Sequence, residues 1–588
     1  MPKKISHKFR QWLAEGKHSR FCRAGARQVL IFTFVLILLI SPIFAFADTE
    51  GERKNFFVDS SYDIKGREGT QAILKKVSEK AYFYLEDEWF NNLTDEEKEK
   101  LNQNLETLSQ EFDEIIYSQL TSSFGQEWSP GIDNEKRITI LFHQMKTEAA
   151  GYFNDGDEFL KIQNEKSNER EMVYLNSDTL FYPIAKSYLA HEFTHLITFN
   201  QKDRLRGVSE EIWLNEARAD YAPTLLGYDT EYQGSNLQQR IRIFVESPSD
   251  SLTEWRGQKN DYGVINLFAQ YLVDNYGKNL LIDSLNSNKV GIPSLDSALE
   301  KNTIGKKFWQ IFTDWTIALF LNDCQFGENY CYKSENLKNL KVTPSLIFLP
   351  STQKTSVSLN YSIKQWSGNW YRIIGGEGEL KLEFDGEDGV QFKLPYILCQ
   401  DSTDCKVEFL ELDGKQKAQV SFENFGKDWT SLTLIPSVQT KTLGFDGREP
   451  SFKFSLSVSL ENKTEEKLIE ELKERITELK AQIAILQSKI AQVLGERGEI
   501  SCQKFEESLY FGIRNYQVSC LQEFLKSQGP EIYPEGLVTG FFGSLTQAAV
   551  IRFQEKYKNE ILIPLGLNQG TGFVGTTTRA KLNEILSR

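Results

Sequence analysis

Histidine is scarce in this chain, and its placement is informative. The 588 residues contain five histidines, and two of them stand four residues apart in His191-Glu-Phe-Thr-His195. On a helix, residues four apart share a face, so both imidazoles can bind one metal ion while Glu192 lies beside them. The alternative is a pair of structural histidines flanking a helix-face glutamate, which the scarcity of histidine disfavours. The motif therefore predicts a metal site with Glu192 as a general base.

A catalytic zinc ion takes three protein ligands and keeps one position for water. Trp213-Leu-Asn-Glu-Ala-Arg-Ala-Asp220 follows the first motif and has the form N-E-x-x-A-D. Together the two motifs resemble the thermolysin-type zinc metallopeptidases, the gluzincins, whose third ligand is a glutamate in N-E-x-x-S-D on the next helix. The resemblance implies that His191, His195 and Glu216 bind zinc, that Glu192 is the general base, and that Asp220 orients a liganding imidazole.

Peptide hydrolysis also needs a hydrogen-bond donor for the oxyanion of its tetrahedral intermediate. Tyr262, in Asp261-Tyr-Gly-Val-Ile-Asn-Leu-Phe268, is similar to the tyrosine that has this role in related zinc aminopeptidases. It departs from that pattern by a missing lysine and a shorter spacing from Glu216. An aromatic side chain that packs on the core at a helix start is the equally open alternative.

The segment before the histidines carries a second resemblance. Tyr117–Phe124, Gly131-Ile-Asp133 and Ala149-Ala-Gly-Tyr-Phe153 are similar to the secreted hyicolysin family. This resemblance implies that residues 48–130 belong to the catalytic unit and are not a removed propeptide.

An acidic turn, Asn154-Asp-Gly-Asp-Glu158, follows that segment. Carboxylates in a turn suit Ca²⁺, but the EF-hand spacing is absent. We therefore favour a solvated turn over a calcium site.

An α+β unit over residues 48–330 has to position the metal site. Thr94 to Glu97 form a capping box that begins a long helix ending near Gly125. Strands are predicted at Arg137–His143 and Met172–Leu175, where β-branched residues are frequent. Helical periodicity follows around residues 183–200, 262–276 and 306–321.

The period changes to two over residues 341–461. Apolar residues alternate with polar ones in three runs that begin at Val357, Leu380 and Phe452, and Asp-Gly pairs separate further runs. This pattern predicts a β-sandwich.

Residues 464–495 have a heptad pattern. One position holds isoleucine and the other leucine or valine: Ile469, Ile476, Ile483 and Ile490, and Leu472, Leu479, Leu486 and Val493. Isoleucine at a with leucine at d favours a parallel two-stranded coiled coil, and hence a parallel homodimer. The alternative is a helix that folds back on its own chain. Either structure would act as a spacer.

Residues 500–588 predict a small three-helix unit. Thr539–Val550 and Thr571–Asn583 resemble the small peptidoglycan-binding domain that is appended to many bacterial wall enzymes, with Thr576 where that family usually has proline. The resemblance implies peptidoglycan as a partner and does not show which residues would contact the glycan.

Residues 1–47 have the order of a secretory signal peptide: basic residues, the apolar run Val29–Ile40, and Ala45-Phe-Ala47 at a cleavage position. An uncleaved membrane anchor is the alternative. The chain has 68 Lys and Arg against 82 Asp and Glu, and the leader is basic, so the mature chain is strongly acidic. An acidic surface argues against nucleic acid and anionic lipid as partners.

One of the seven cysteines, Cys22, lies in the leader. The other six form three close pairs: Cys324 with Cys331, Cys399 with Cys405, and Cys502 with Cys520. In an exported protein this spacing predicts three local disulfides.

These features together predict a secreted zinc endopeptidase of the bacterial cell envelope that cleaves proteins or peptides, with an exopeptidase left open. Two alternatives remain: a hydrolase of peptidoglycan stem peptides, and a non-catalytic wall-binding or adhesion protein. The second is disfavoured because a vestigial site has no need of Glu192.

Overall fold

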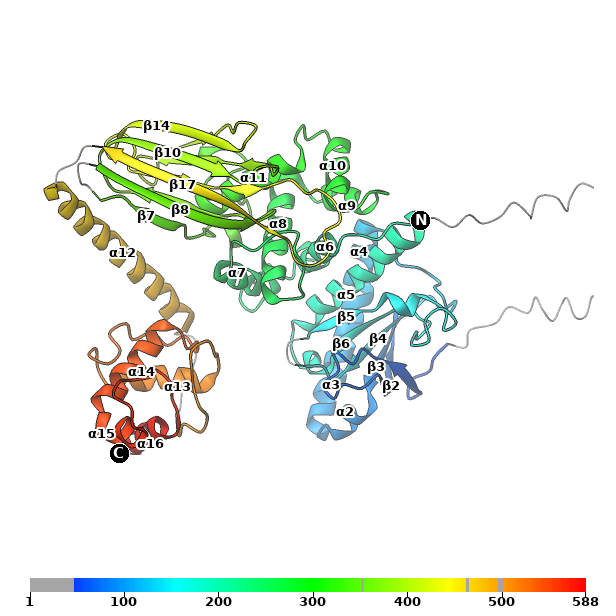
Figure 1. The fold of residues 1–588 in the computed structure, drawn as a ribbon. Helices are drawn as coiled ribbons and strands as arrows, with labels where there is room; N and C mark the ends of the chain where they lie inside the picture. Colours follow the sequence, from blue (N-terminus) through cyan, green and yellow to red (C-terminus); the bar gives the residue numbers. More distant parts are fainter. Residues whose placement is uncertain (1–46, 147–148, 351–353, 462–464, 495–501, 588) are drawn as a thin grey trace, which may run out of the picture.

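The computed structural model describes residues 47–587 except 147–148, 351–353, 462–464 and 495–501. The predicted signal peptide therefore lies outside the described residues, apart from Ala47. The protein is multidomain, with mixed α and β structure and several sheets (Figure 1).

The first unit is built on a six-stranded sheet in the order β1-β2-β3-β4-β6-β5. Its strands are β1 (Arg53–Phe57), β2 (Gly69–Val77), β3 (Ala81–Glu86), β4 (Ile138–His143), β5 (Gly151–Phe153) and β6 (Met172–Asn176). β3, β4 and β6 are parallel, and Ala81 lies opposite Ile138. Residues 53–86 thus form one sheet with the two predicted strands, which are confirmed as β4 and β6.

The predicted long helix is confirmed as three consecutive segments, α3 (Asp95–Glu111), the π-helical η1 (Phe112–Tyr117) and α4 (Ser118–Phe124). The capping box is formed: the Thr94 hydroxyl accepts from the Glu97 amide at 3.3 Å, and the Glu97 carboxylate accepts from the Thr94 amide at 2.8 Å. A short helix, α2 (Asp87–Asn92), precedes it. The apolar side of α3 to α4 packs in the same core as β3, β4 and β6.

Helices dominate the rest of this unit. They are η2 (Asp155–Glu158), η3 (Ser177–Phe181), α5 (Ala185–Phe199), η4 (Asn200–Arg204), α6 (Ile212–Leu225), α7 (Asn236–Glu246), α8 (Lys259–Tyr276), α9 (Asn279–Leu285), α10 (Gly291–Lys301), α11 (Phe308–Leu321), η5 (Cys324–Phe326) and η6 (Glu335–Leu337). α5 and α11 are buried on nearly all sides. A helix that is buried nearly all round belongs to a core, so these two form the centre of the unit.

Two sheets then pack around one apolar core. One has the order β14-β10-β17-β8 and the other β13-β12-β15-β9-β7, with β11 and β16 as a separate pair. The strands are β7 (Ser345–Phe348), β8 (Lys354–Lys364), β9 (Tyr371–Ile374), β10 (Gly378–Gly386), β11 (Phe392–Lys393), β12 (Pro395–Cys399), β13 (Cys405–Phe409), β14 (Lys417–Phe425), β15 (Ser431–Leu434), β16 (Ser437–Val438) and β17 (Ser451–Glu461). The three alternating runs of the sequence are β8, β10 and β17. We call this part, residues 345–461, the β-sandwich.

The core of the first unit does not end at the expected boundary near residue 341. Trp366, Trp370 and Phe445 of the β-sandwich are almost fully buried in that core. The indole of Trp370 donates to the carbonyl of Thr316 at 2.9 Å, and the ring of Trp366 lies 5.0 Å from that of Phe308. The β-sandwich and the helical part of the first unit are therefore packed together.

A single long helix, α12 (Glu465–Leu494), stands between the β-sandwich and a C-terminal helical unit (Figure 1). That unit contains α13 (Tyr516–Ser527), α14 (Ser544–Lys556), α15 (Lys558–Ile561), η7 (Ile563–Leu565) and α16 (Thr576–Leu586). The short α15 adds to the three helices that the sequence predicted.

An internal repeat organises this C-terminal unit and was not recognised from the sequence. The Gln522 side chain accepts from the amides of Thr539 and Gly540 at 2.7 and 2.8 Å. Gln554, 32 residues later, accepts in the same way from Thr571 and Gly572 at 2.8 and 3.0 Å. Each buried glutamine thus ties one Thr-Gly-Phe turn to a helix.

All three predicted disulfides are present, between Cys324 and Cys331, Cys399 and Cys405, and Cys502 and Cys520. Disulfides persist in oxidising compartments, so they indicate an extracellular protein. Among the described residues, no helix has the length and apolar character needed to span a membrane.

Candidate metal centre

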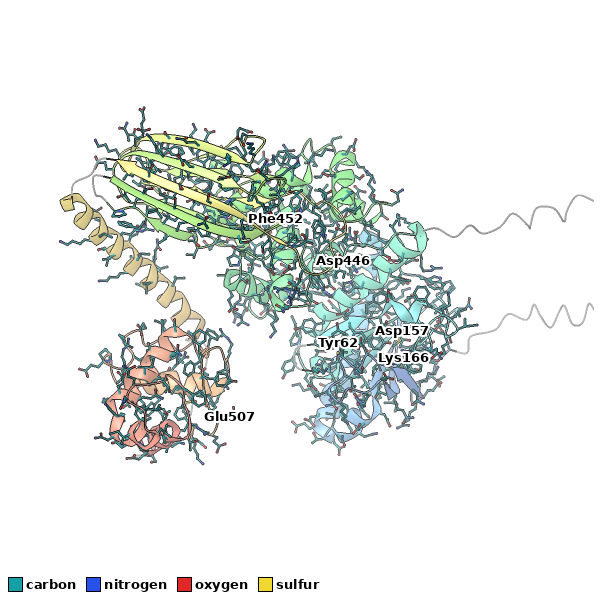
Figure 2. The ribbon with its side chains drawn as sticks, in the orientation of Figure 1. Tyr62, Asp157, Lys166, Asp446, Phe452 and Glu507 are labelled. Atoms are coloured by element: carbon teal, nitrogen blue, oxygen red, sulfur yellow. A yellow bond between two sulfur atoms is a disulfide. The ribbon has the colours of Figure 1, made fainter. Side chains whose placement is uncertain are left out.

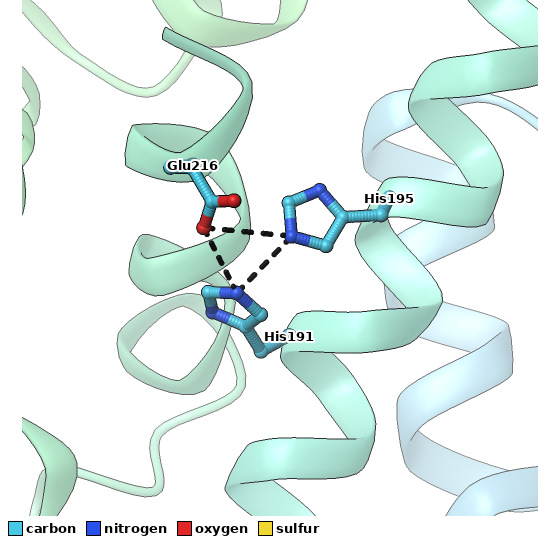
Figure 3. A group of neighbouring side chains, drawn as sticks. All are labelled: His191, His195 and Glu216. Atoms are coloured by element: carbon cyan, nitrogen blue, oxygen red, sulfur yellow. Dashed lines mark hydrogen bonds and ion pairs between the residues drawn. The ribbon is translucent and has the colours of Figure 1, made fainter. Parts of the chain in front are cut away.

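α5 and α6 bring the three predicted ligands together (Figure 3). The Nε2 atoms of His191 and His195 lie 3.1 Å apart, and the Oε2 atom of Glu216 lies 3.3 Å from the first and 3.6 Å from the second. Residues four apart on α5 share one face, and that face is turned toward α6. In the described part of the chain, these three residues form the one group of three or more His, Cys, Asp or Glu side chains that could hold a metal ion.

The separations fit a tetrahedral metal ion. Zinc bonds of 2.0–2.2 Å to nitrogen and oxygen at tetrahedral angles require ligand atoms about 3.3 Å apart. The three observed separations lie close to this value. The donor set of two imidazoles and one carboxylate leaves a fourth position for water.

Each imidazole has a polar side chain beside its other nitrogen. Nδ1 of His191 lies 3.7 Å from Oδ1 of Asp220, and Nδ1 of His195 lies 3.1 Å from Oδ1 of Asn215. A partner at Nδ1 fixes the ring and leaves the Nε2 lone pair for a metal. Asp220 is thus placed as predicted. Asn215 was missed, although it is the first letter of N-E-x-x-A-D.

Asp220 is itself held by α7, which the sequence analysis did not connect to the site. The Arg240 guanidinium donates to both carboxylate oxygens, at 2.7 to 3.0 Å, and the Asn236 amide donates to Oδ1 at 3.2 Å. Burial alone would raise the pKa of Asp220, but Arg240 and His191 hold it well below its usual range. The carboxylate beside His191 is therefore ionised. No regular spacing in the sequence links α7 to α6, so the sequence did not indicate that Arg240 contacts Asp220.

Opposite charges within the ligand group stabilise one another. Burial lowers the pKa of His191, but the neighbouring Asp220 and Glu216 outweigh it and raise that pKa to about 10. Burial raises the pKa of Glu216, but His195 and His191 lower it to about 2. A cation is thus favoured at the point where these side chains meet, as a proton or as a metal ion.

Glu192 lies on α5 beside the ligands and is only 5% exposed. Burial raises its pKa, while the two histidines lower it. Its Oε2 atom has no hydrogen-bond partner among the described residues. β5 packs against it closely, since a Cβ atom at Gly151 would lie 2.9 Å from Cγ of Glu192. An unpartnered carboxylate with a raised pKa is suited to accept a proton.

Tyr262, on α8, lies near His191. The two ring centroids are 6.3 Å apart, and the Arg240 guanidinium lies 4.7 Å above the tyrosine ring. Burial and the nearby Glu216 and Glu192 raise the pKa of its hydroxyl far above the usual range. The hydroxyl is therefore protonated, as a hydrogen-bond donor must be.

A second tyrosine near the site, Tyr62, was missed by the sequence analysis. Tyr62 is 38% exposed and is labelled in Figure 2. Its ring stacks on that of Tyr152 of β5 at 4.7 Å, next to Gly151, which lies close to Glu192. Burial and the charges of Glu192 and Glu216 raise the pKa of its hydroxyl. Tyr62 is more than a hundred residues from the histidines, so spacing held no hint of it.

The acidic turn predicted as a weak candidate for calcium forms η2. Its Asp157 carboxylate already accepts from the Tyr174 hydroxyl at 2.5 Å and from the Asn168 amide at 2.6 Å. This carboxylate is hydrogen-bonded and buried, and not solvated as the favoured interpretation had it. The described residues of the turn do not gather three metal-binding side chains.

Comparison with known protein families and with curated proteins finds no match. Among solved structures, the chain is similar to the pre-peptidase C-terminal domain of a collagenase from Bacillus anthracis, at 12% identity over 20% of this chain and 94% of that one, with a TM-score of 0.14. It is also similar to a periplasmic inhibitor of g-type lysozyme from Aeromonas hydrophila, at 14% identity over 20% of this chain and all of that one (100%), with a TM-score of 0.15. Likenesses this low carry no conclusion about the site.

Proposed function

We propose that the protein is a secreted zinc-dependent endopeptidase. The observation that supports this most directly is the convergence of Nε2 of His191, Nε2 of His195 and Oε2 of Glu216, which lie 3.1 to 3.6 Å apart, with the Glu192 carboxylate close enough to interact with all three side chains. Three ligands, an open fourth position and an adjacent base are what hydrolysis by an activated water requires.

Zinc, when bound, lowers the pKa of its water to about 7 and polarises the scissile carbonyl. The chain's own residues do the rest. Glu192 accepts the proton of the attacking water and passes it to the leaving amine. Asp220 and Asn215 hold the two imidazoles in the metal-binding orientation, and the Tyr262 hydroxyl donates to the oxyanion.

The C-terminal part of the chain suggests where the enzyme acts. The unit from residue 500 onward resembles a peptidoglycan-binding domain, and α12 separates it from the metal centre. Attachment to the wall would raise the effective concentration of the enzyme toward substrates there. We therefore propose the cell envelope as its location and envelope proteins or peptides as its substrates.

The decisive experiment compares residues 48–588 with their Glu192→Gln variant, measuring zinc content and casein cleavage. We expect one zinc per chain in both proteins and a loss of kcat of about 1,000-fold in the variant, because the base that activates water is removed. Glu408→Gln is the control and should cleave like the wild type, because Glu408 lies on β13 with its side chain 41% exposed beside Lys406.

Other outcomes separate the alternatives. Zinc without casein cleavage, but with release of stem peptides from purified sacculi, would identify a peptidoglycan hydrolase. A purified protein that contains no zinc but still binds to sacculi would be identified as a non-catalytic wall-binding protein.

A further inference from the structure

The segment between α7 and α8 is bound by the β-sandwich. Leu252 donates its amide to the carbonyl of Trp366 at 2.8 Å, and the Ser251 hydroxyl donates to the carbonyl of Gln365 at 2.7 Å. On its other side, the amide of Trp255 donates to the carbonyl of Gly447 at 3.1 Å. Residues 251–255 are therefore held between two stretches of the β-sandwich, the end of β8 and the loop before β17.

A buried charge reinforces this connection. Glu254 is fully buried, and its carboxylate accepts from Lys364 of β8, from the Arg256 guanidinium at 3.0 Å and from the Glu449 amide at 2.6 Å. A buried carboxylate is stable only when it is paired and hydrogen-bonded. Since two of its three partners belong to the β-sandwich, the position of Glu254 depends on that part of the molecule.

The next residue carries the connection to the metal centre. The Trp255 ring meets the Tyr262 ring edge-on at 4.9 Å, and the Tyr262 ring lies 6.3 Å from that of His191. The Tyr262 hydroxyl makes no hydrogen bond to another described residue, so its direction is set by the packing of its ring. That packing includes Trp255 at 4.9 Å and Arg240 at 4.7 Å, beside the core of the first unit.

We propose that the β-sandwich contributes to catalysis at the metal centre. It holds Glu254 and Trp255, and these two residues position Tyr262 beside His191. Glu254 and Trp255 are positioning residues, since neither contacts the metal ligands. The inference rests on the proposed hydrolysis, in which Tyr262 donates to the oxyanion. A donor aligned by its neighbours needs no reorganisation during the reaction, and small displacements of such a group lower kcat steeply.

A double-mutant cycle on residues 48–588 tests the proposal. Trp255 is only half-buried, and Trp255→Leu removes the edge-on contact while keeping an apolar side chain. We expect kcat to fall about 5- to 10-fold with KM and zinc content unchanged. In the Tyr262→Phe background the same substitution should change kcat less than about 2-fold, because the hydroxyl that Trp255 positions is absent. Equal factors in the two backgrounds would overturn the proposal, and so would a Tyr262→Phe variant with the kcat of the wild type.

Glu254→Gln is the second variant, in case Trp255→Leu lowers the yield of folded protein. It keeps the shape of the side chain and removes the charge that Lys364 and Arg256 pair with. The matched control is Asp385→Asn, which breaks the exposed pair with Lys417 elsewhere in the β-sandwich. We expect kcat to fall several-fold in Glu254→Gln alone, and this loss to vanish in the Tyr262→Phe background.

A Glu254→Gln protein that melts at a lower temperature but keeps the kcat of Asp385→Asn would show a merely structural role and overturn the proposal. Failure of the proposed function is a separate result: it would appear as a chain without zinc, or as full cleavage by Glu192→Gln.

Discussion

At the residue scale, the two imidazoles differ in what holds them. His191 is oriented by an ionised carboxylate, Asp220, which Arg240 keeps in place, whereas His195 is oriented by the neutral amide of Asn215. A charged partner raises the basicity of an imidazole more than a neutral one does. The motif positions of Asp220 and Asn215 follow from the helix period, since residues 215, 216 and 220 all face α5.

The contact between β5 and α5 depends on a glycine. A Cβ atom at Gly151 would lie 2.7 Å from the Tyr174 carbonyl oxygen and 2.9 Å from Cγ of Glu192. Gly151→Ala should therefore displace the general base and lower kcat about 10-fold or more, with zinc content unchanged. Gly414→Ala, at a glycine with no atom within 4 Å of the added methyl group, is the control. Steady-state kinetics check this, and equal kcat values for the two variants would contradict it.

At the scale of elements, the segment between β5 and β6 contains two buried glutamates. Glu158 is 4% and Glu171 3% exposed, and the hydrogen bond from the Arg170 amide to the Asp157 carbonyl brings them together. Burial, Glu171 and Asp157 raise the pKa of Glu158 well above its ordinary value. Burial and Asp133 raise that of Glu171 to about 7, although the Ile132 amide lowers it. The pair is therefore stable only while it carries a proton.

Such a pair makes folding dependent on pH. Because both pKa values are higher in the folded state, the contribution to stability is complete below the unfolded pKa of about 4.5 and is lost as pH rises toward 7. Glu158→Gln should remove most of this loss. The difference in the free energy of unfolding between the variant and the protein with Glu158 should therefore be about 1–3 kcal/mol more in favour of the variant at pH 7.5 than at pH 5. Melting temperatures in the Glu192→Gln background, which avoids self-cleavage, measure it. A pH dependence like that of Glu408→Gln would contradict it.

At the scale of the whole molecule, α12 exposes most of the apolar stripe over the part whose side chains the structure describes. Leu472, Ile476, Ile483 and Leu486 are 37 to 58% exposed, and Leu479 is half-buried. A helix folded back on its chain would bury them, so this alternative loses support. A second α12 is the partner that isoleucine at a and leucine at d favour.

We therefore expect a dimer that depends on this stripe. Sedimentation of residues 48–588 should give twice the chain mass, and the double substitution Ile476→Gln with Ile483→Gln should give a monomer. Ile485→Gln, equally exposed but outside the stripe, is the control and should remain a dimer. A wild-type monomer at micromolar concentration would contradict the prediction.

The sequence by itself determined the features that depend on local spacing. His191 and His195 share a helix face, and the alternation in β8, β10 and β17 produces strands, because each follows from the period of one element. The capping box at Thr94 begins a helix through its spacing of three residues to Glu97. Glu216 was expected from the resemblance of its motif and not from a period. The local disulfides belong to the same class, since their cysteines are close along the chain.

The tertiary structure alone decided which distant segments meet. Arg240 reaches Asp220 from another helix, Tyr62 lies more than a hundred residues before the histidines, and Trp255 is held by a loop of the β-sandwich more than a hundred residues after it. These contacts arise because burying apolar surface brings the β-sandwich and the helices into one core. The free energy gained by that burial does not depend on how far apart two residues are along the chain, so the spacing of residues in the sequence does not predict which of them meet.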